Sequence, residues 1–253
     1  MKLRSLVVGV SVAFVVLTSF QSYAEEEWGV IGEVGTSNKD VEFSTFDGST
    51  GTRAVFSFDV LTLDYAGTFY YQNFYTRLKL SRTIQDDTIF SSGAVINATR
   101  EDLDLTVGYF IGAGFSGFIG YKRADFEAIS AVDGISVPGE VNSKTKFVDD
   151  GPFIGVSYSL PLQDSSFSFS FAYADMDGEI RRSTVTVDQS TTGSTTGASY
   201  FASWSKPVSD STTFIVSLNA VRYDFDDEED GLGNDQSTEQ SFDIISVGIS
   251  HYF

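Results

Sequence analysis

The chain has no cysteine and only one histidine among its 253 residues. Without cysteine it can form neither a disulfide bond nor a zinc site of the Cys/His type, so an exported fold would depend on hydrogen bonds and packing. Lysine and arginine are also scarce: 16 of them face 35 aspartates and glutamates, which gives a formal net charge of −19. Because neutralising a phosphate backbone takes many basic side chains, we do not expect nucleic acid as a partner.

Long apolar runs are missing, with one exception near the start of the chain. Leu6–Leu17 is apolar, follows Lys2 and Arg4, and precedes a small-x-small sequence that ends at Ala24. This order is typical of a secretory signal peptide that is cleaved after Ala24. An uncleaved anchor helix is the alternative, but the apolar run is short for a membrane span. We therefore expect two segments, a signal peptide (1–24) and a single domain (25–253).

Beyond residue 24 the chain alternates between apolar and polar positions. Aromatic residues make up 15% of the chain, yet no run there approaches the roughly 18 apolar residues of a membrane helix. Alternating segments of about ten residues are separated by turn-forming stretches, as in transmembrane β-strands. Arg100–Gly112 has the clearest pattern, with one face formed by Leu103, Leu105, Val107, Tyr109 and Ile111.

Ten such segments can be placed. Four of the connections between them are short, five are long and polar, and the two kinds alternate, which is typical of outer-membrane barrels. An even number of strands would put both ends of the domain on the periplasmic side. Eight strands are the alternative, if the first two segments are misassigned. The expected strands are 27–37, 53–64, 68–84, 100–112, 117–127, 147–160, 166–177, 198–206, 212–225 and 241–253.

The last expected strand, Ser241–Phe253, has the most specific pattern. One of its faces is mostly apolar and the other is mostly small or polar. The segment resembles the closing strand of Gram-negative outer-membrane β-barrels, in which a terminal phenylalanine preceded by alternate apolar residues is the assembly signal. The residues that carry this resemblance are Ile245, Val247, Ile249, His251 and Phe253.

The resemblance to small outer-membrane barrels, the group that includes OmpA-like and OmpX-like proteins, extends over residues 25–253. It implies an all-β fold, a transmembrane antiparallel up-and-down β-barrel in the bacterial outer membrane. The implied partners are membrane lipid, lipopolysaccharide and the barrel-assembly machinery, which would bind the closing strand. A soluble lipocalin-like barrel is the alternative, but the export signal and the two kinds of connection favour a membrane barrel. Four aromatic residues would form an interfacial girdle at the periplasmic end: Trp28, Phe115, Trp204 and Phe253.

Segment 53–64 is ambiguous. Phe58 and Val60 share one face whereas Leu61 lies on the other, so a bulge near Val60 would be needed to keep a single apolar face. If Phe58 faces lipid, Asp59 points inward.

A charged cluster is expected inside the barrel. Arg77 and Lys79 flank Leu78 in the sequence and would point inward if Leu78 faces lipid. Asp59 and Asp104 would then flank them from the two neighbouring strands. Such charges would have to pair, because an unpaired charge in a narrow interior is costly. The cluster either fills the lumen or forms a gate or selectivity element in a narrow pore.

The other chemically suggestive features give weak signals. Barrel enzymes of this class use a histidine with serine, asparagine or an acid, and barrel proteases place an Asp–His pair at the extracellular rim, but His251 lies at the expected periplasmic edge on the lipid face.

The acidic stretch Asp226–Asp235 begins like an EF-hand loop, yet its twelfth position, where a bidentate glutamate is required, is Ser237. We interpret it as a solvated loop, with divalent-cation bridging to lipopolysaccharide phosphates as a weaker alternative. Neither a resident metal nor a cofactor is expected.

The sequence therefore predicts a non-enzymatic surface or envelope protein whose barrel is largely filled by side chains. A narrow, porin-like channel for small solutes is the alternative. An outer-membrane hydrolase is disfavoured by the position of His251.

Overall fold

The computed structural model describes residues 28–47, 52–86, 88–91, 94–132, 143–183, 188–227 and 236–253. The predicted signal peptide (1–24) and most of the acidic loop lie outside these residues. Within them, no helix is long and apolar enough to cross a membrane. The strands are β1 (Trp28–Asp47), β2 (Thr52–Tyr71), β3 (Phe74–Asp86), β4 (Thr88–Ser91), β5 (Ala94–Gly112), β6 (Phe115–Val132), β7 (Ser143–Pro161), β8 (Ser166–Ser183), β9 (Asp188–Pro207), β10 (Thr212–Asp227) and β11 (Gln236–Tyr252).

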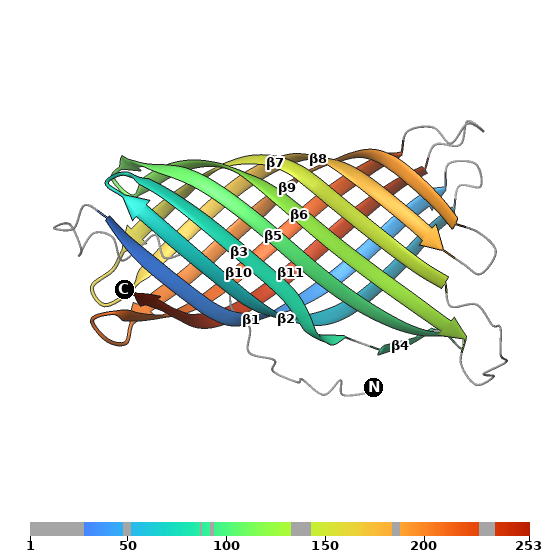
Figure 1. Ribbon diagram of the computed structural model, residues 1–253, viewed down its shortest axis with the longest axis horizontal. Coiled ribbons are helices and arrows are strands. Elements are labelled where there is room, and N and C mark those ends of the chain that lie inside the picture. Colours follow the sequence, from blue (N-terminus) through green and yellow to red (C-terminus); the bar gives the residue numbers. More distant parts are fainter. Residues whose placement is uncertain are drawn as a thin grey trace.

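The strands close into one antiparallel barrel (Figure 1). Apart from β3 and β4, each strand pairs with its neighbours in the sequence, and β1 pairs with β11, which completes the ring. β3 and β4 both pair with β5 and together occupy a single position in the wall. The barrel is thus the ten-stranded, up-and-down β-barrel that the sequence predicts, and the eight-stranded alternative is wrong.

Four short turns lie at the same end of the barrel as the start of β1 and the C-terminus (Figure 1). The turn between β2 and β3 is at Gln72–Asn73, not at residues 65–67 as predicted, because Gly67 continues the strand and pairs with Gly32 and Leu78. Left-handed backbone marks the actual turns: Gln72 has a φ of 53° and Gly114 a φ of 85°. Gly67 is therefore a glycine inside a strand and not a turn residue.

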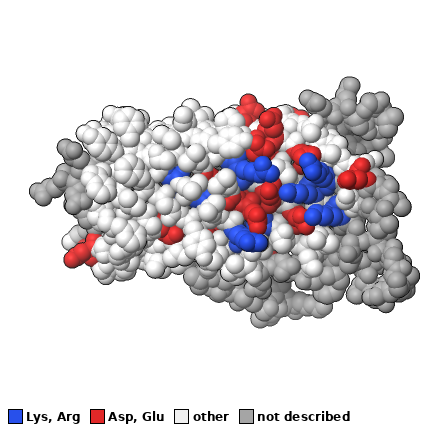
Figure 2. Space-filling view, in the orientation of Figure 1, with Lys and Arg blue, Asp and Glu red and all other residues white. Residues whose placement is uncertain are grey.

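An apolar belt surrounds the outside of the barrel next to the short turns. On β5 it runs from Leu103 to Ile111, with every second side chain exposed. A rise of about 3.3 Å per residue and a tilt of about 40° give this stretch a height of roughly 23 Å, which matches the apolar band of a membrane barrel. The half of the surface next to the short turns is mainly uncharged in Figure 2, and charged side chains gather in the other half.

The belt ends at charged residues that face outward on nearly every strand. Beyond them the strands continue toward the long connections, for instance over 41–47 of β1 and 124–132 of β6. We call this second half of the wall the extension. The residues that mark its boundary are Asp40, Asp59, Arg82, Glu101, Arg123, Asp150, Asp175, Arg222 and Asp243.

Two apolar clusters fill the interior at different heights. The cluster next to the short turns contains Ile31, Tyr70, Tyr75 and Ile215. The cluster in the extension is larger and built around phenylalanines, with Phe43 and Phe126 at 4.9 Å between ring centroids. Charged side chains occupy the space between the two clusters.

Candidate functional site: a charged layer inside the barrel

Ten ionisable side chains project into the barrel between the two apolar clusters. They come mainly from β1, β2, β3, β5 and β6, which are consecutive in the wall, and from positions that alternate with the outward apolar ones. Among the described residues, this charged layer has equal numbers of cations and acids. Its cations are Lys39, Arg77, Lys79, Arg100 and Lys122, and its acids are Glu33, Asp64, Asp102, Asp104 and Asp149.

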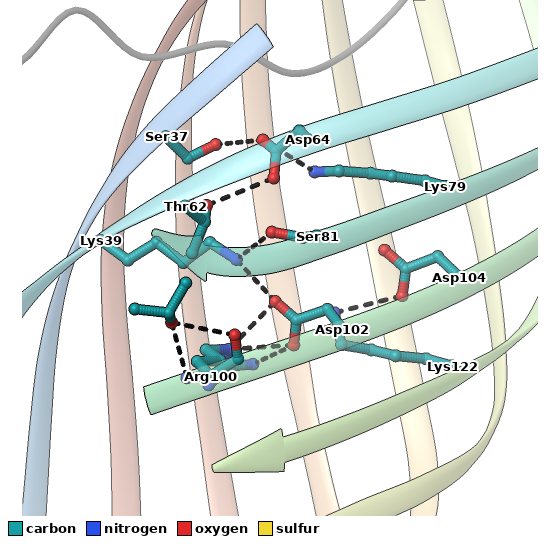
Figure 3. Close-up of polar contacts among 11 residues, drawn as sticks. Ser37, Lys39, Thr62, Asp64, Lys79, Ser81, Arg100, Asp102, Asp104 and Lys122 are labelled. Carbon is teal, nitrogen blue, oxygen red and sulfur yellow. Dashed lines mark hydrogen bonds and ion pairs between the residues drawn. The ribbon is translucent and has the colours of Figure 1, made fainter. Parts of the chain in front are cut away.

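Asp102 is the centre of the layer (Figure 3). Lys39 Nζ donates a hydrogen bond to Asp102 Oδ2 at 2.6 Å, and Arg100 Nε donates to both carboxylate oxygens at 2.9 and 3.0 Å. Lys39 also donates to Ser81 Oγ at 2.9 Å, and the Arg100 guanidinium lies 4.1 Å from the centroid of the Phe242 ring. One buried carboxylate therefore pairs with two buried cations, and the charge balances only over the whole layer.

Other pairs flank this centre. Arg77 donates to Glu33 Oε2 at 2.7 Å, with both side chains almost fully buried. Asp64 accepts hydrogen bonds from Ser37 and Thr62, and Lys79 Nζ lies 3.7 Å from its Oδ2.

On the next strands, Lys122 Nζ lies 3.3 Å from Asp104 Oδ1. The acids of the layer thus all contact hydrogen-bond donors or cations, as expected for charges in a narrow interior.

The structure places three members of the predicted cluster in the lumen. Arg77, Lys79 and Asp104 point inward, and they form ion pairs with Glu33, Asp64 and Lys122, respectively. The roles predicted for these residues, filling of the lumen or a gate in a narrow pore, stay predictions.

The inward position predicted for Asp59 is wrong. Phe58 and Val60 are buried in the lumen, so Asp59 between them faces outward. β1 and β2 pair without interruption through Val60, and the one register shift of β2, against β3, falls between Leu61 and Thr62. The extra residue at this shift is Ile84 of β3, so β2 itself has no bulge near Val60, and its apolar residues change face because β2 passes from the belt into the extension.

A cavity of about 160 Å³ lies against the charged layer. Its opposite wall is small or polar and includes Ser170, Ala172 and Ser199. Asn219 and Asp104 line it, and the buried Oδ1 atoms of both accept no hydrogen bond from the described residues. A space of this size has room for a few water molecules.

Asp149 belongs to the layer but lies in the extension, beyond the belt. Thr195 Oγ1 donates to its Oδ1 at 2.8 Å, and Gln240 Nε2 donates to Oδ2 at 3.4 Å. Burial nevertheless raises the pKa of Asp149 above its ordinary value, and the hydrogen bonds and Arg100 offset this only in part.

Asp149→Asn is expected to remove a pH-dependent loss of stability. Because the pKa of Asp149 is higher in the folded protein than in the unfolded chain, the folded wild type binds the carboxyl proton more tightly. The free energy of unfolding therefore falls as the pH rises from about 4, the ordinary pKa of aspartate, through the raised pKa of the folded state. In urea unfolding the variant should be more stable than the wild type at neutral pH, and the gain should shrink toward pH 4. A variant less stable than the wild type at neutral pH would contradict this account.

The residues predicted to be interfacial lie on the outside, at the short-turn end. Trp28 and Phe115 are exposed, Trp204 is half-buried against Phe214, and Phe253 is the most exposed of the four at 73%. On the closing strand, Ile245, Ile249 and His251 are exposed and Val247 is partly buried, while the buried Ser246 and Ser250 face the lumen. Their roles in membrane anchoring and assembly stay predictions.

His251 is far from the charged layer. Its Nδ1 lies 3.1 Å from Thr212 Oγ1, and its ring packs edge-on against Phe253, outside the barrel. Among the described residues, no group of three or more His, Cys, Asp or Glu is placed to hold a metal ion.

Comparisons with known proteins give a clear result only for structure. No family model and no curated protein sequence matches the chain. The outer-membrane protease OmpT from Escherichia coli has a TM-score of 0.62 at 11% identity, with 89% of this chain and 96% of OmpT covered. The fold is that of an outer-membrane β-barrel. At this identity the likeness to OmpT shows the fold and not the activity.

Other solved structures are similar over most of their length but less closely. The translocator domain of the autotransporter NalP from Neisseria meningitidis has a TM-score of 0.49 at 11% identity, with 92% of both chains covered. A Pseudomonas aeruginosa FadL homologue has a TM-score of 0.37 at 9% identity, with 88% of this chain and 90% of the homologue covered.

Sequence reasoning missed most of the acids in the charged layer. Glu33, Asp64 and Asp102 lie on strands whose inward faces could have been assigned once the belt was located. Asp102 lies in Arg100–Gly112, the segment with the clearest alternation, so its inward position was the easiest of the three to predict. Glu33 and Asp64 also lie within the expected strands 27–37 and 53–64, but Asp64 shares a face with Phe58 and Val60, which the sequence alone suggests is the lipid-facing one.

Proposed function

We propose that the chain is a non-enzymatic, non-conducting outer-membrane barrel that holds a rigid extension and its connecting loops outside the membrane. It would serve a structural or surface-interaction role in the cell envelope. The observation that supports this proposal is the filling of the lumen by a charge-balanced layer between two apolar clusters. A barrel of this size leaves little more room than its inward side chains occupy.

The direction in the membrane follows from the two halves of the wall. The apolar belt and the girdle residues lie next to the short turns, so this end would face the periplasm, with Trp28 and Phe253 on that side. The extension and the acidic loop would then face the exterior, where the belt boundary meets lipopolysaccharide. The closing strand would be the contact for the barrel-assembly machinery.

A narrow channel is the second candidate, and the cavity beside Asp104 and Asn219 is the observation that favours it. In that case the cavity would be a widening in a path that the two apolar clusters close most of the time. Lys79, which lines the cavity, would then influence ion selectivity.

Conductance in planar bilayers separates the two candidates. The refolded wild type is expected to give no steady conductance above that of the lipid, because both apolar clusters block the lumen. The double variant Phe43→Ala/Tyr75→Ala removes one ring from each cluster and should give channel-opening events. It is the positive control that inserted barrels can be detected by conductance. A steady wild-type conductance whose ion selectivity changes in Lys79→Ala would overturn the closed-barrel proposal in favour of the channel.

The absence of enzymatic activity is part of the same proposal. A histidine-dependent hydrolase would need its imidazole near acids or hydroxyls in a protected site, whereas His251 is exposed beside the apolar belt. If hydrolysis of a peptide or lipid by the refolded wild type were lost in His251→Ala, this part of the proposal would fail.

A further inference from the structure

A hollow interrupts the apolar belt on the outer surface of β8–β11. Its volume is about 470 Å³. Ala202 of β9 and Ala220 of β10 form its floor, and Tyr200 and Leu218, which are 57% and 55% exposed, form its sides. The register places Ala202 beside Leu218 and Ala220 beside Tyr200, so the two alanines lie on a diagonal between the larger side chains. The result is a narrow hollow in the surface rather than a flat face.

A charged pair lies where the hollow meets the belt boundary. Asp243 lines the hollow, and Arg222 Nη2 donates to Asp243 Oδ1 at 2.7 Å. Both side chains are more than half exposed, so the Arg222 guanidinium is accessible from outside the barrel. The hollow therefore has apolar walls along the belt and a cation at the level where lipid head groups would lie.

We propose that this hollow is a binding site for one acyl chain of an anionic membrane lipid whose phosphate contacts Arg222. The order of the two parts, apolar hollow and then cation, matches the order of chain and phosphate in a lipid. A methylene chain fits a narrow hollow between protruding side chains, and the guanidinium binds phosphate oxygens in a fork geometry. A second copy of this chain is the alternative occupant. It would have to insert a protruding side chain into the hollow and place an anion against Arg222.

Native mass spectrometry of the refolded full-length domain tests the site. Protein would be released from detergent micelles that contain phosphatidylglycerol or phosphatidylethanolamine as the lipid probe. The wild type should retain one phosphatidylglycerol molecule at an activation energy that strips other lipids. Ala202→Phe and Ala220→Leu, which fill the hollow, should lose the retained lipid. Thr76→Phe, which places the same phenyl ring at an exposed belt position on β3, should keep it.

Two further variants separate the head group from the chain. Arg222→Gln should abolish the preference for phosphatidylglycerol over phosphatidylethanolamine, while retention of a lipid chain continues. Because the chain has no cysteine, Ala202→Cys introduces a single thiol, and a disulfide-linked dimer in vesicles would identify a second copy as the occupant. Equal retention by the wild type and the filled variants, or that dimer, would overturn the proposal.

Discussion

Asp102→Asn is expected to lower the free energy of unfolding by about 3–5 kcal/mol, the typical cost of removing one partner from a buried ion pair. Asp102 is buried and accepts hydrogen bonds from both Lys39 and Arg100. The asparagine keeps the volume of the side chain but leaves two neighbouring cations with no carboxylate between them. The loss should therefore exceed that of an ordinary polar substitution.

Urea unfolding of the refolded protein in lipid vesicles, followed by tryptophan fluorescence and by heat-modifiable migration on gels, measures the effect. Glu101→Gln is the matched control, since Glu101 is the next residue on β5 and pairs with Arg82 at 3.0 Å on the outside, where the side chains are 60% and 81% exposed. An exposed pair of this kind contributes less than about 1 kcal/mol. Lys39→Met/Asp102→Asn, which restores the charge balance of the lumen, should recover part of the stability. Equal losses in Asp102→Asn and Glu101→Gln would show that the charged layer does not hold the barrel together.

The sequence predicts the belt well because the membrane imposes one simple rule on it. Outward positions must be apolar, and inward positions in a narrow barrel must be small, polar or paired. On β5 this rule alone separates Leu103 and Leu105 from Asp102 and Asp104, and the structure places each of them on the expected side. The same rule accounts for the strand number and for the positions of Arg77 and Lys79.

The extension was harder to predict because the rule reverses there. Outside the belt the outer face meets water and is polar, while the inner face is filled by aromatic side chains. On β2, Tyr65 faces out in the belt whereas Phe58 faces in within the extension, although both are large apolar residues. If one apolar face is assumed for the whole of β2, the alternation would break near Val60, and Asp59 is predicted to point inward. The alternation itself is unbroken.

Strand length was also underestimated, for a related reason. β9 begins at Asp188, but residues 188–197 are nearly all Ser, Thr and Gly, with no apolar face to suggest a strand. Their backbone pairs with β8 and β10, and their small side chains leave room for larger neighbours such as Phe225, which lies against Gly178 and Gly193. Pairing between neighbouring strands, which no local pattern reveals, determines where these strands end.

The second large effect is expected for Phe126→Ala in the apolar cluster of the extension, which should lower the free energy of unfolding by about 3–5 kcal/mol. Phe126 is 3% exposed, and its ring lies 4.9 Å from that of Phe58 with an angle of 7° between the planes. It also contacts Phe43 and Phe147. Truncation would leave a cavity among rings that hydrogen-bonded strands hold apart, so the site can collapse only slightly.

Phe46→Ala is the control for this prediction, because Phe46 is in the extension but 44% exposed on the outside, and substitution there should change stability by less than about 0.5 kcal/mol. Benzene offers a second measurement that depends on the cavity itself. An apolar void lined by rings should bind benzene, so the ligand should stabilise Phe126→Ala and leave the wild type unchanged. If Phe126→Ala and Phe46→Ala lose equally little and benzene stabilises neither, the extension would be held by its backbone hydrogen bonds and not by its aromatic interior. The closed-barrel proposal would then rest on the charged layer and the cluster at the short-turn end alone.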